Sequence, residues 1–183
     1  VTPLKASHYY YKQLSLKDGV TSAVRCILTD KQGFVWIGTK AGISRYDGHE
    51  LKKYVYSPNN PHSIPNNLIH QIAEDEMSNI WILTDKGIAR YQRQSDDFFL
   101  PTDEKGNPII AYSTCLTKDG VLFGSKDKVY FYSYRDPSLR LLQKLNKGNN
   151  FNISLLSLWN EHTVLCCSRW QGLALQDLKT GKH

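Results

Sequence analysis

Residues 27–48 read ILTDKQGFVWIGTKAGISRYDG, and the same pattern returns over residues 72–91 as IAEDEMSNIWILTDKGIARY. The two stretches match without a gap at a constant offset of 45 residues, for example from Trp36 to Trp81 (81 − 36). Repetition at a period of roughly 20–50 residues is the sequence signature of repeat folds. The chain is therefore expected to consist of repeated units about this long.

Two weaker copies follow. In residues 119–125, Gly124 and Ser125 align with Gly38 and Thr39 of the first stretch. Residues 163–175 keep a strand–turn–strand pattern. Neither copy contains the repeated tryptophan. The chain of 183 residues thus holds about four units.

Each unit contains four short apolar or alternating stretches separated by turn residues. In the second unit these are residues 68–74, 80–84, 87–92 and 97–100. Four antiparallel strands in a repeat of this length are typical of a propeller blade. No long window shows the apolar spacing of a helix. The sequence predicts an all-β β-propeller of four-stranded antiparallel blades, with about four blades present.

The predicted boundaries make the whole of residues 1–183 one propeller segment. Residues 9–14 are expected to be an outer strand that completes another blade. The four blades are expected at about residues 22–57, 66–101, 109–145 and 152–183, the last one partial. We expect a fragment of a larger ring of about seven blades. A fragment leaves unpaired blade faces, so self-association is also expected.

Residues that recur in every blade are expected to be structural. Trp36 and Trp81 lie within strands and should be core residues, and Trp159 is also expected to pack inside. The hydroxyls of the Thr or Ser at the ends of second strands should bond a turn. The structural set is Asp30, Gly33, Trp36, Thr39, Gly42, Tyr46, Asp75, Trp81, Thr84, Gly87 and Tyr91, together with the weaker Ser125 and Ser168.

Composition excludes several classes of protein. The net charge is +6, but no basic helix or Lys/Arg run is present to follow a nucleic-acid backbone. No apolar run approaches the roughly 20 residues of a membrane span, and no signal peptide is recognised. The cysteines and histidines lack zinc-ligand spacing, so no metal and no cofactor are expected. Cys26, Cys115, Cys166 and Cys167 are expected to be buried free thiols.

The loops between second and third strands are the predicted binding surface. In an up-and-down blade they share a face with the inter-blade loops, and each of them carries a cation: Lys40, Lys86, Lys126 and Arg169. These cations could form an electropositive rim for uronate or sulfated sugars, which Arg can grip bidentately. The alternative is that short polar turns commonly contain lysine.

Two further side chains are candidates. Trp170 lies in a loop one residue longer than its counterparts, where its indole could stack on a sugar ring or could pack between blades. His62, in the spacer between the first two units, is either a ligand contact or a lone histidine on a loop. No unrepeated cluster of His, Glu and Asp indicates catalysis, so we expect a binding segment and no catalytic residue.

The pattern of residues 30–48 resembles the two-component regulator propeller repeat. The lead-in at residues 14–20 and the spacer at residues 57–67 are similar to those of that family, while Leu83 departs from its Gly. The resemblance implies a periplasmic sensor region of a hybrid two-component system of gut Bacteroidetes. Such a region binds oligosaccharides and signals through a membrane helix to a histidine kinase, a receiver and a DNA-binding module. None of those downstream parts is in this chain.

Other functions stay open at this point. Propellers also serve as non-catalytic scaffolds that bind another protein, and fold alone does not decide between the two. A polysaccharide lyase or glycosidase is the third possibility. Expected partners are an oligosaccharide, possibly an acidic one, and the remaining blades of a parent protein.

Overall fold

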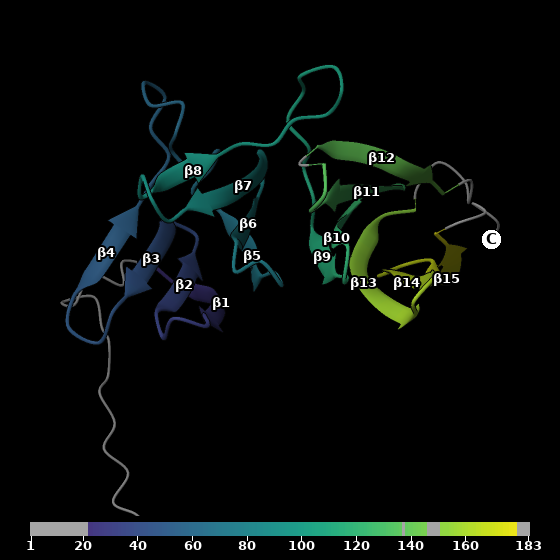
Figure 1. Ribbon diagram of the computed structural model, residues 1–183, viewed down its shortest axis with the longest axis horizontal. Helices are drawn as coiled ribbons and strands as arrows, with labels where there is room; N and C mark the ends of the chain where they lie inside the picture. The colour runs from purple at the N-terminus through teal and green to yellow at the C-terminus, as the bar shows by residue number, and fades with distance from the viewer. Residues whose placement is uncertain (1–21, 137, 146–150, 179–183) are drawn as a thin grey trace, which may run out of the picture.

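The computed structural model describes residues 22–136, 138–145 and 151–178, which form fifteen strands in four antiparallel sheets (Figure 1). The first sheet contains β1 (Val24–Thr29), β2 (Val35–Thr39), β3 (Gly42–Tyr46) and β4 (Leu51–Tyr54). The second contains β5 (Ile69–Glu74), β6 (Ile80–Thr84), β7 (Gly87–Gln92) and β8 (Asp97–Phe99). The third contains β9 (Ser113–Leu116), β10 (Gly120–Ser125), β11 (Lys128–Ser133) and β12 (Leu139–Lys144). The fourth contains β13 (Ile153–Asn160), β14 (Thr163–Ser168) and β15 (Gly172–Asp177).

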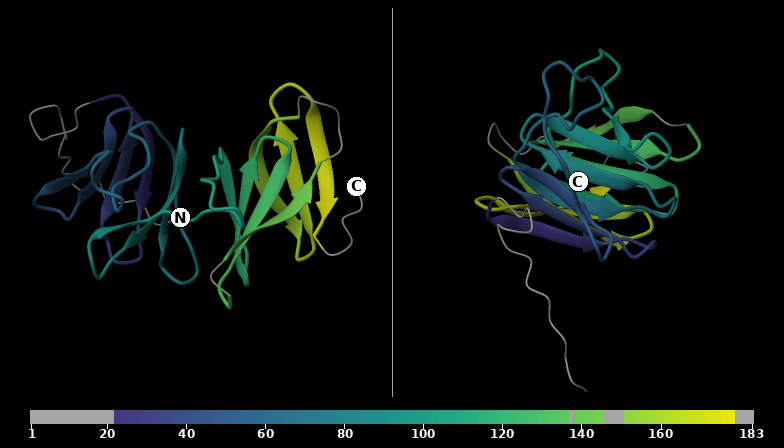
Figure 2. Two further views of the ribbon diagram at one scale, coloured as in Figure 1. Left: turned by 90° about the horizontal axis from the view of Figure 1, so that it is seen from above. Right: turned by 90° about the vertical axis from the view of Figure 1, so that its left-hand side faces the viewer.

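Within every sheet the strands follow chain order, and the first strand of each sheet packs next to the first strand of its neighbour. The sheets stand side by side like blades, as the two views of Figure 2 show. The predicted fold, a β-propeller of antiparallel blades, is confirmed. The sheets lie inside the predicted unit ranges. The predicted outer strand at residues 9–14 lies outside the described residues.

A buried Asp–Trp pair anchors each of the first two sheets. The indole N–H of Trp36 donates to Asp30 Oδ2 at 2.9 Å, and that of Trp81 donates to Asp75 Oδ2 at 2.7 Å. Both tryptophans are fully buried. Asp30 Oδ1 also accepts the backbone N–H of Phe34 at 2.9 Å. These contacts place the tryptophan in the core, and the aspartate braces the turn between strands one and two.

The repeated hydroxyl closes the turn between strands two and three. Thr39 Oγ1 donates to the carbonyl of Gly42 at 2.9 Å, and Thr84 Oγ1 donates to the carbonyl of Gly87 at 2.8 Å. The prediction is wrong for Ser168, whose buried Oγ has no hydrogen-bond partner in the described chain. Gly42 has φ +111°, and a Cβ there would lie 2.5 Å from the carbonyl oxygen of Tyr54, so only glycine fits.

Leu83 explains why the four sheets are unevenly spaced. At the matching position of the first sheet, a Cβ on Gly38 would lie 2.8 Å from Ile69 of β5, so that inner strand packs directly on the glycine. Leu83 is fully buried in the cluster that also contains Ala111. Its side chain needs more room than glycine, and Figure 2 shows a wider separation between the second and third sheets than between the other neighbouring sheets. The departure from the repeat therefore widens one gap.

Asp96 ties the first sheet to the second at their outer edges. Its carboxylate accepts hydrogen bonds from the hydroxyls of Tyr54, at 2.6 Å, and of Tyr91, and it pairs with Arg45, at 3.3 Å, and with Lys52. Burial alone would raise the pKa of Asp96, but hydrogen bonds from Lys52 and the two tyrosines outweigh it and lower the pKa to about 2. The network therefore requires the carboxylate anion.

Acid should weaken this network. A carboxyl group whose pKa is depressed by folding adds stability that is fully present above its unfolded pKa of about 3.9. That stability is lost as the pH falls toward the folded pKa of about 2.

We expect Asp96→Asn to lower the free energy of unfolding at pH 6 by about 1–2 kcal/mol, as measured by urea unfolding. The loss is limited to this size because the site is partly solvated. The difference between wild type and variant should shrink steadily from pH 4 to pH 2.5. A difference that does not change with pH would contradict this assignment. Asn tolerates the positive φ of +55° found at this position.

Candidate functional site

The loops that join second to third strands lie at one end of the blades. They are residues 40–41, 85–86, 126–127 and 169–171. Their four cations are all exposed, and none of them forms an ion pair with another described residue: Lys40, Lys86, Lys126 and Arg169. By contrast, Lys118 at the opposite end pairs with Glu161 at 2.6 Å. The loop cations are therefore available to an anionic ligand.

The backbone fixes the direction of one of these loops. Lys126 has φ +47°, an uncommon value for a residue with a side chain. Its carbonyl accepts the backbone N–H of Ile153 at 2.8 Å, which ties the loop to the first strand of the fourth sheet. The backbone of Lys126 is thus held between two sheets while its side chain stays exposed.

A second set of residues lies directly beneath these loops, and sequence reasoning missed it. In three sheets the first strand contains one residue that is not paired with the second strand, close to the point where the second strand ends. The skipped residues are Arg25, His70 and Ser154, and Tyr112 holds the matching place just before β9. We call these four the bulge positions. β-Bulges re-aim side chains and are frequent beside binding sites.

Contacts around His70 show that bulge positions and loops meet. Its Nε2 atom bonds the carboxylate of Asp85, which lies in the loop beside Lys86. Its ring lies 5.4 Å from the ring of Tyr112, edge to face. Tyr112 is 40% exposed. A histidine of β5, a carboxylate of the loop after β6 and a phenol just before β9 therefore lie together at the end of the blades that carries the loop cations, which we call the mouth.

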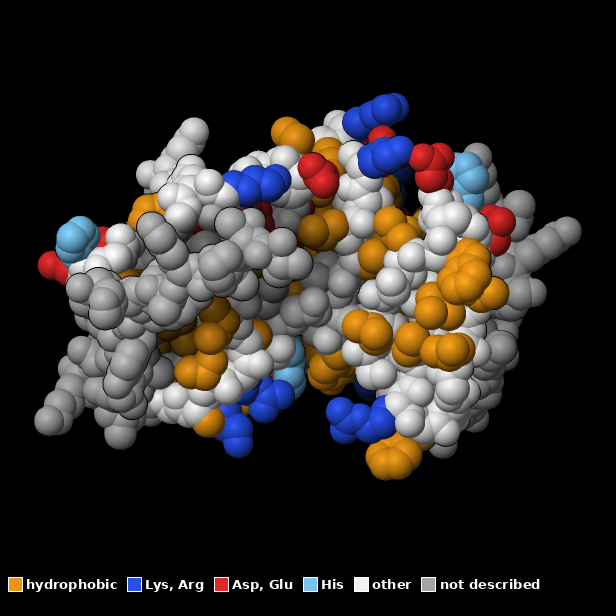
Figure 3. Space-filling view, turned by 90° about the horizontal axis from the view of Figure 1, so that it is seen from below, with side chains coloured by type: hydrophobic (Ala, Val, Ile, Leu, Met, Phe, Trp, Pro, Cys, Tyr) orange, Lys and Arg blue, Asp and Glu red, His pale blue; other side chains and the backbone are white. Residues whose placement is uncertain are grey.

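Figure 3 shows how this part of the surface is charged. Lys and Arg side chains lie on both sides of a notch between the two halves of the molecule, along one edge of the face in view. Apolar side chains cover much of the exposed surface beside the notch. The arrangement suits a ligand that carries negative charge and also offers an apolar face.

Trp170 and His62 have different surroundings. Trp170 is 86% exposed at the end of the fourth sheet, beside Arg169, so its indole is free to stack on a ligand. His62 lies on the outer edge of the second sheet instead. Its carbonyl accepts the N–H of Phe98, and its Nδ1 lies 3.7 Å from Asp97 Oδ2. The structure does not bring His62 together with the loop cations.

Trp159 corrects a prediction. It was expected to be packed inside, yet it is 68% exposed. It lies at an irregularity in the pairing of β13, between Leu158 and Asn160, and lines a cavity of about 590 Å³ between the third and fourth sheets. Leu122, which stands in this cavity where the repeat has tryptophan, is too small to fill the space.

The cysteines and acidic residues show no other site. All four cysteines are free thiols, and only Cys166 is fully buried. Burial raises the pKa of Cys26 to about 11 and that of Cys166 to about 12, so both stay protonated near neutral pH. Among the described residues, no group of three or more His, Cys, Asp or Glu side chains could hold a metal. The described residues also include no helix that is long and apolar enough to cross a membrane.

Comparisons with known proteins identify the repeat. Residues 18–41 match the family model described as two component regulator propeller. A 59-residue stretch, 32% of the chain, is 37% identical to histidine kinase P4 of Formosa agariphila, and covers 4% of that protein. Residues 18–41 therefore match this repeat, which confirms the resemblance seen in the sequence.

Two similar solved structures are extracellular domains from B. thetaiotaomicron. One, assigned to a one-component system, has a TM-score of 0.72 at 19% identity over 88% of this chain and 24% of its own length. The other, assigned to a hybrid two-component system, has a TM-score of 0.68 at 23% identity over 90% of this chain and 21% of its own length. At these identities the likeness shows the propeller fold. The chain spans less than a quarter of each solved domain.

Proposed function

We propose that this chain is part of the periplasmic ligand-sensing propeller of a hybrid two-component regulator and that it binds an acidic oligosaccharide derived from glycan breakdown. Its occupancy would be signalled to a histidine kinase downstream. The likeness to extracellular domains of such systems supports a sensor role. The observation that carries the ligand class is the set of exposed loop cations that form no ion pair with any described residue.

Each group at the mouth has a chemical use in this proposal. Lys40 and Lys86 would attract carboxylate or sulfate groups, and Arg169 would bind one of them with two parallel hydrogen bonds. The exposed indole of Trp170 would stack against the C–H face of a sugar ring. Asp85 and Tyr112 would bond sugar hydroxyls, which both donate and accept hydrogen bonds.

Calorimetric titration tests the proposal with a matched pair of ligands. Oligogalacturonides carry one carboxylate per sugar, whereas their methyl esters have the same skeleton without charge. We expect heat with uronate or sulfated oligosaccharides and much weaker binding of the methyl esters. No heat with any glycan, together with tight capture of a protein partner, would favour the scaffold alternative. Turnover of a glycan would contradict a purely binding role.

Loss of a loop cation should weaken the acidic ligand selectively. We expect Lys40→Ala and Arg169→Ala each to lower affinity for an oligogalacturonide about fivefold, which corresponds to about 1 kcal/mol for an exposed charge contact. Lys118→Ala is the control, because it removes the same charge at the opposite end of the blades. If all three variants lose the same affinity, only net charge matters and the loops are not the site.

The proposal also includes a larger propeller. The face of the fourth sheet turned away from the third exposes large apolar side chains, among them Leu155 (53%), Leu173 (63%) and Leu175 (48%). Exposed apolar surface of this kind marks an interaction site. We propose that further blades, or a second copy of this piece, cover it.

A further inference from the structure

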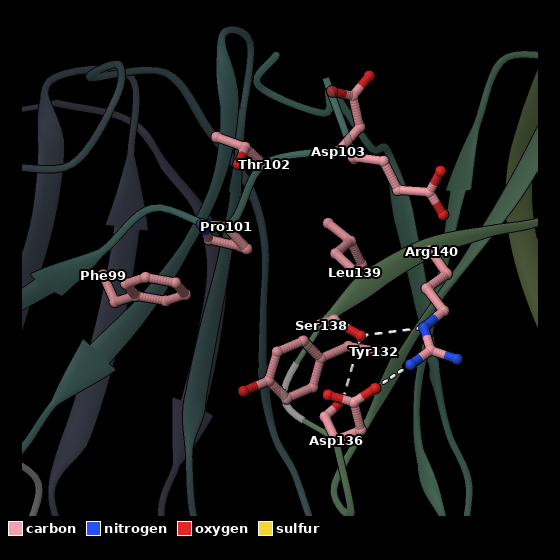
Figure 4. A pocket seen from close by; sticks show the side chains of 10 residues that line it. Phe99, Pro101, Thr102, Asp103, Tyr132, Asp136, Ser138, Leu139 and Arg140 are labelled. Carbon is pink, nitrogen blue, oxygen red and sulfur yellow. Dashed lines mark hydrogen bonds and ion pairs between the residues drawn. The ribbon is translucent and has the colours of Figure 1, made fainter. Parts of the chain in front are cut away.

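A second cavity, of about 420 Å³, lies between the outer edges of the second and third sheets. Figure 4 shows Phe99 and Pro101 on one side of it and Leu139 and Arg140 on the other. Its walls come from the third and fourth strands of the blades and from the spacer after β8. The cavity is therefore separate from the mouth, which is formed by the loops after the second strands and by residues at the start of the first strands.

The matching place between the first and second sheets is filled by the chain itself. Strand pairing sets Lys52 opposite Arg45 and Phe99 opposite Arg90, so Phe99 corresponds to Lys52. Two residues further on, Pro101 corresponds to Tyr54. In the first sheet the Tyr54 ring packs edge to face on Phe98, with ring centroids 5.3 Å apart. The second sheet thus has Pro101 in place of the phenol of Tyr54 and Phe99 in place of the ammonium group of Lys52.

The third sheet keeps one partner of such a pair, the tyrosine that corresponds to Tyr91. Tyr132 corresponds to Tyr91, and its hydroxyl accepts a hydrogen bond from Arg90 at 2.5 Å, as that of Tyr91 does from Arg45. The Arg90 guanidinium also lies 5.1 Å over the Phe99 ring, which fixes that wall. In the first gap, Asp96 receives both the Tyr54 hydroxyl and the Lys52 ammonium.

The charge on the cavity is negative. Its lining includes three carboxylates, those of Asp103, Glu104 and Asp136, against one guanidinium, that of Arg140, which pairs with Asp136. Asp136 stands one position before the residue that corresponds to Asp96. Asp103 is engaged by the backbone N–H groups of Lys105 and Asn107 in its own turn. Glu104 is exposed at the entrance.

We propose that this cavity binds an aryl ring that carries a cationic amine, the pair of groups which Tyr54 and Lys52 supply in the preceding gap. The ring lies between Phe99 and Leu139, and its ammonium group faces Glu104. The group comes either from a free arylalkylamine or from a lysine and a tyrosine two positions apart in a polypeptide segment. The site is separate from the glycan mouth and does not depend on it.

Binding of three small probes tests the charge requirement. Tyramine, its neutral analogue tyrosol and the anionic 4-hydroxyphenylacetate share one ring and differ in charge. We expect tyramine to bind at least fivefold more tightly than tyrosol, as judged by NMR titration of the full chain, and the anion to bind most weakly. Equal affinities for the three, or preference for the anion, would overturn the proposal.

Two variants test the location. Pro101→Tyr restores the residue of the preceding blade and should reduce tyramine affinity at least tenfold by filling the cavity. The Glu104 side chain is exposed, so Glu104→Gln should fold normally. It should nevertheless lower the protein's preference for tyramine over tyrosol about threefold. Glu161→Gln, the same change at another edge, is the control. Unchanged tyramine binding in Glu104→Gln, or an equal effect of Glu161→Gln, would overturn the site.

A capped Lys-Gly-Tyr peptide, which copies the spacing of Lys52 and Tyr54, distinguishes the source of the group. Tighter binding of the peptide than of tyramine would assign the cavity to a polypeptide segment. Tighter binding of tyramine would assign it to a free amine. Failure of both to bind at millimolar concentration would overturn the proposal.

Discussion

Replacing Trp81 with alanine is expected to destabilise the protein by about 3–5 kcal/mol. The side chain is fully buried, and its indole N–H donates to Asp75. Its ring also packs edge to face on Phe123 and Tyr132 of the third sheet, with centroids 5.1 and 4.8 Å apart. The substitution therefore leaves a cavity between two sheets and a buried carboxylate with one donor fewer. Urea unfolding followed by circular dichroism measures the loss.

Trp159→Ala is the matched control for that experiment. It removes the same side chain from a position that is 68% exposed and makes no ring contact within the described residues. We expect a loss below about 1 kcal/mol, as for most surface substitutions. Similar losses for the two variants would show that the repeated tryptophan does not anchor the blade.

The second large effect is expected at Asp30. Its side chain is fully buried, and besides the Trp36 indole it receives Arg93 Nη2 from the second sheet at 3.1 Å. Burial alone raises the pKa of Asp30, but hydrogen bonds from Trp36, Phe34 and Arg93 outweigh it, so the pKa lies below its usual value. Asp30→Ala should cost about 3 kcal/mol or more, because it leaves the buried indole N–H of Trp36 without its acceptor and removes the contact of Arg93 with the first sheet's buried carboxylate.

Asp47→Ala is the control for Asp30. Asp47 also caps a turn, by accepting the backbone N–H groups of His49 and Glu50 at 2.8 and 2.7 Å, but it is exposed and has no partner in another sheet among the described residues. Its loss should be much smaller. An Asp30 variant as stable as the Asp47 variant would mean that the contact between sheets contributes little.

Most of the fold could be predicted because the length of the repeat and its pattern of four strands are those of a propeller blade. Trp36 and Trp81 recur at a constant offset. A residue type that recurs at the same place in successive blades has a structural role in the blade, so its burial could be predicted. The same argument located Thr39 and Thr84 at the turn between second and third strands. It also located the loop cations, since a loop between two matched strands is known once the strands are known.

The remaining features depend on register, which repetition does not reveal. His70 reaches the mouth because a bulge shifts it out of pairing, and Tyr112 reaches it from the matching place just before β9; nothing in the residue types marks either position. Trp159 was expected to be buried because it stands in an apolar run, yet an irregularity at the end of β13 leaves it exposed. Pro101 is visible as a departure only after strand pairing aligns it with Tyr54.

Leu83 lies between these two cases. Its departure from the repeat is plain in the sequence, but its effect is not. Only the close packing of Ile69 on Gly38 shows that a larger side chain must widen the gap between sheets. The wider gap separates the second and third sheets, between whose outer edges the cavity lined by Phe99 and Leu139 lies.

The most direct test of the central claim is an NMR map of the backbone amides as an oligogalacturonide is added. The account predicts shifts at the four cation-bearing loops and at the bulge positions Arg25, His70, Tyr112 and Ser154. It predicts unchanged amides at the opposite turns, residues 117–119 and 160–162, and little effect of the methyl ester. Shifts confined to those opposite turns, or equal shifts with the charged and uncharged ligands, would contradict it.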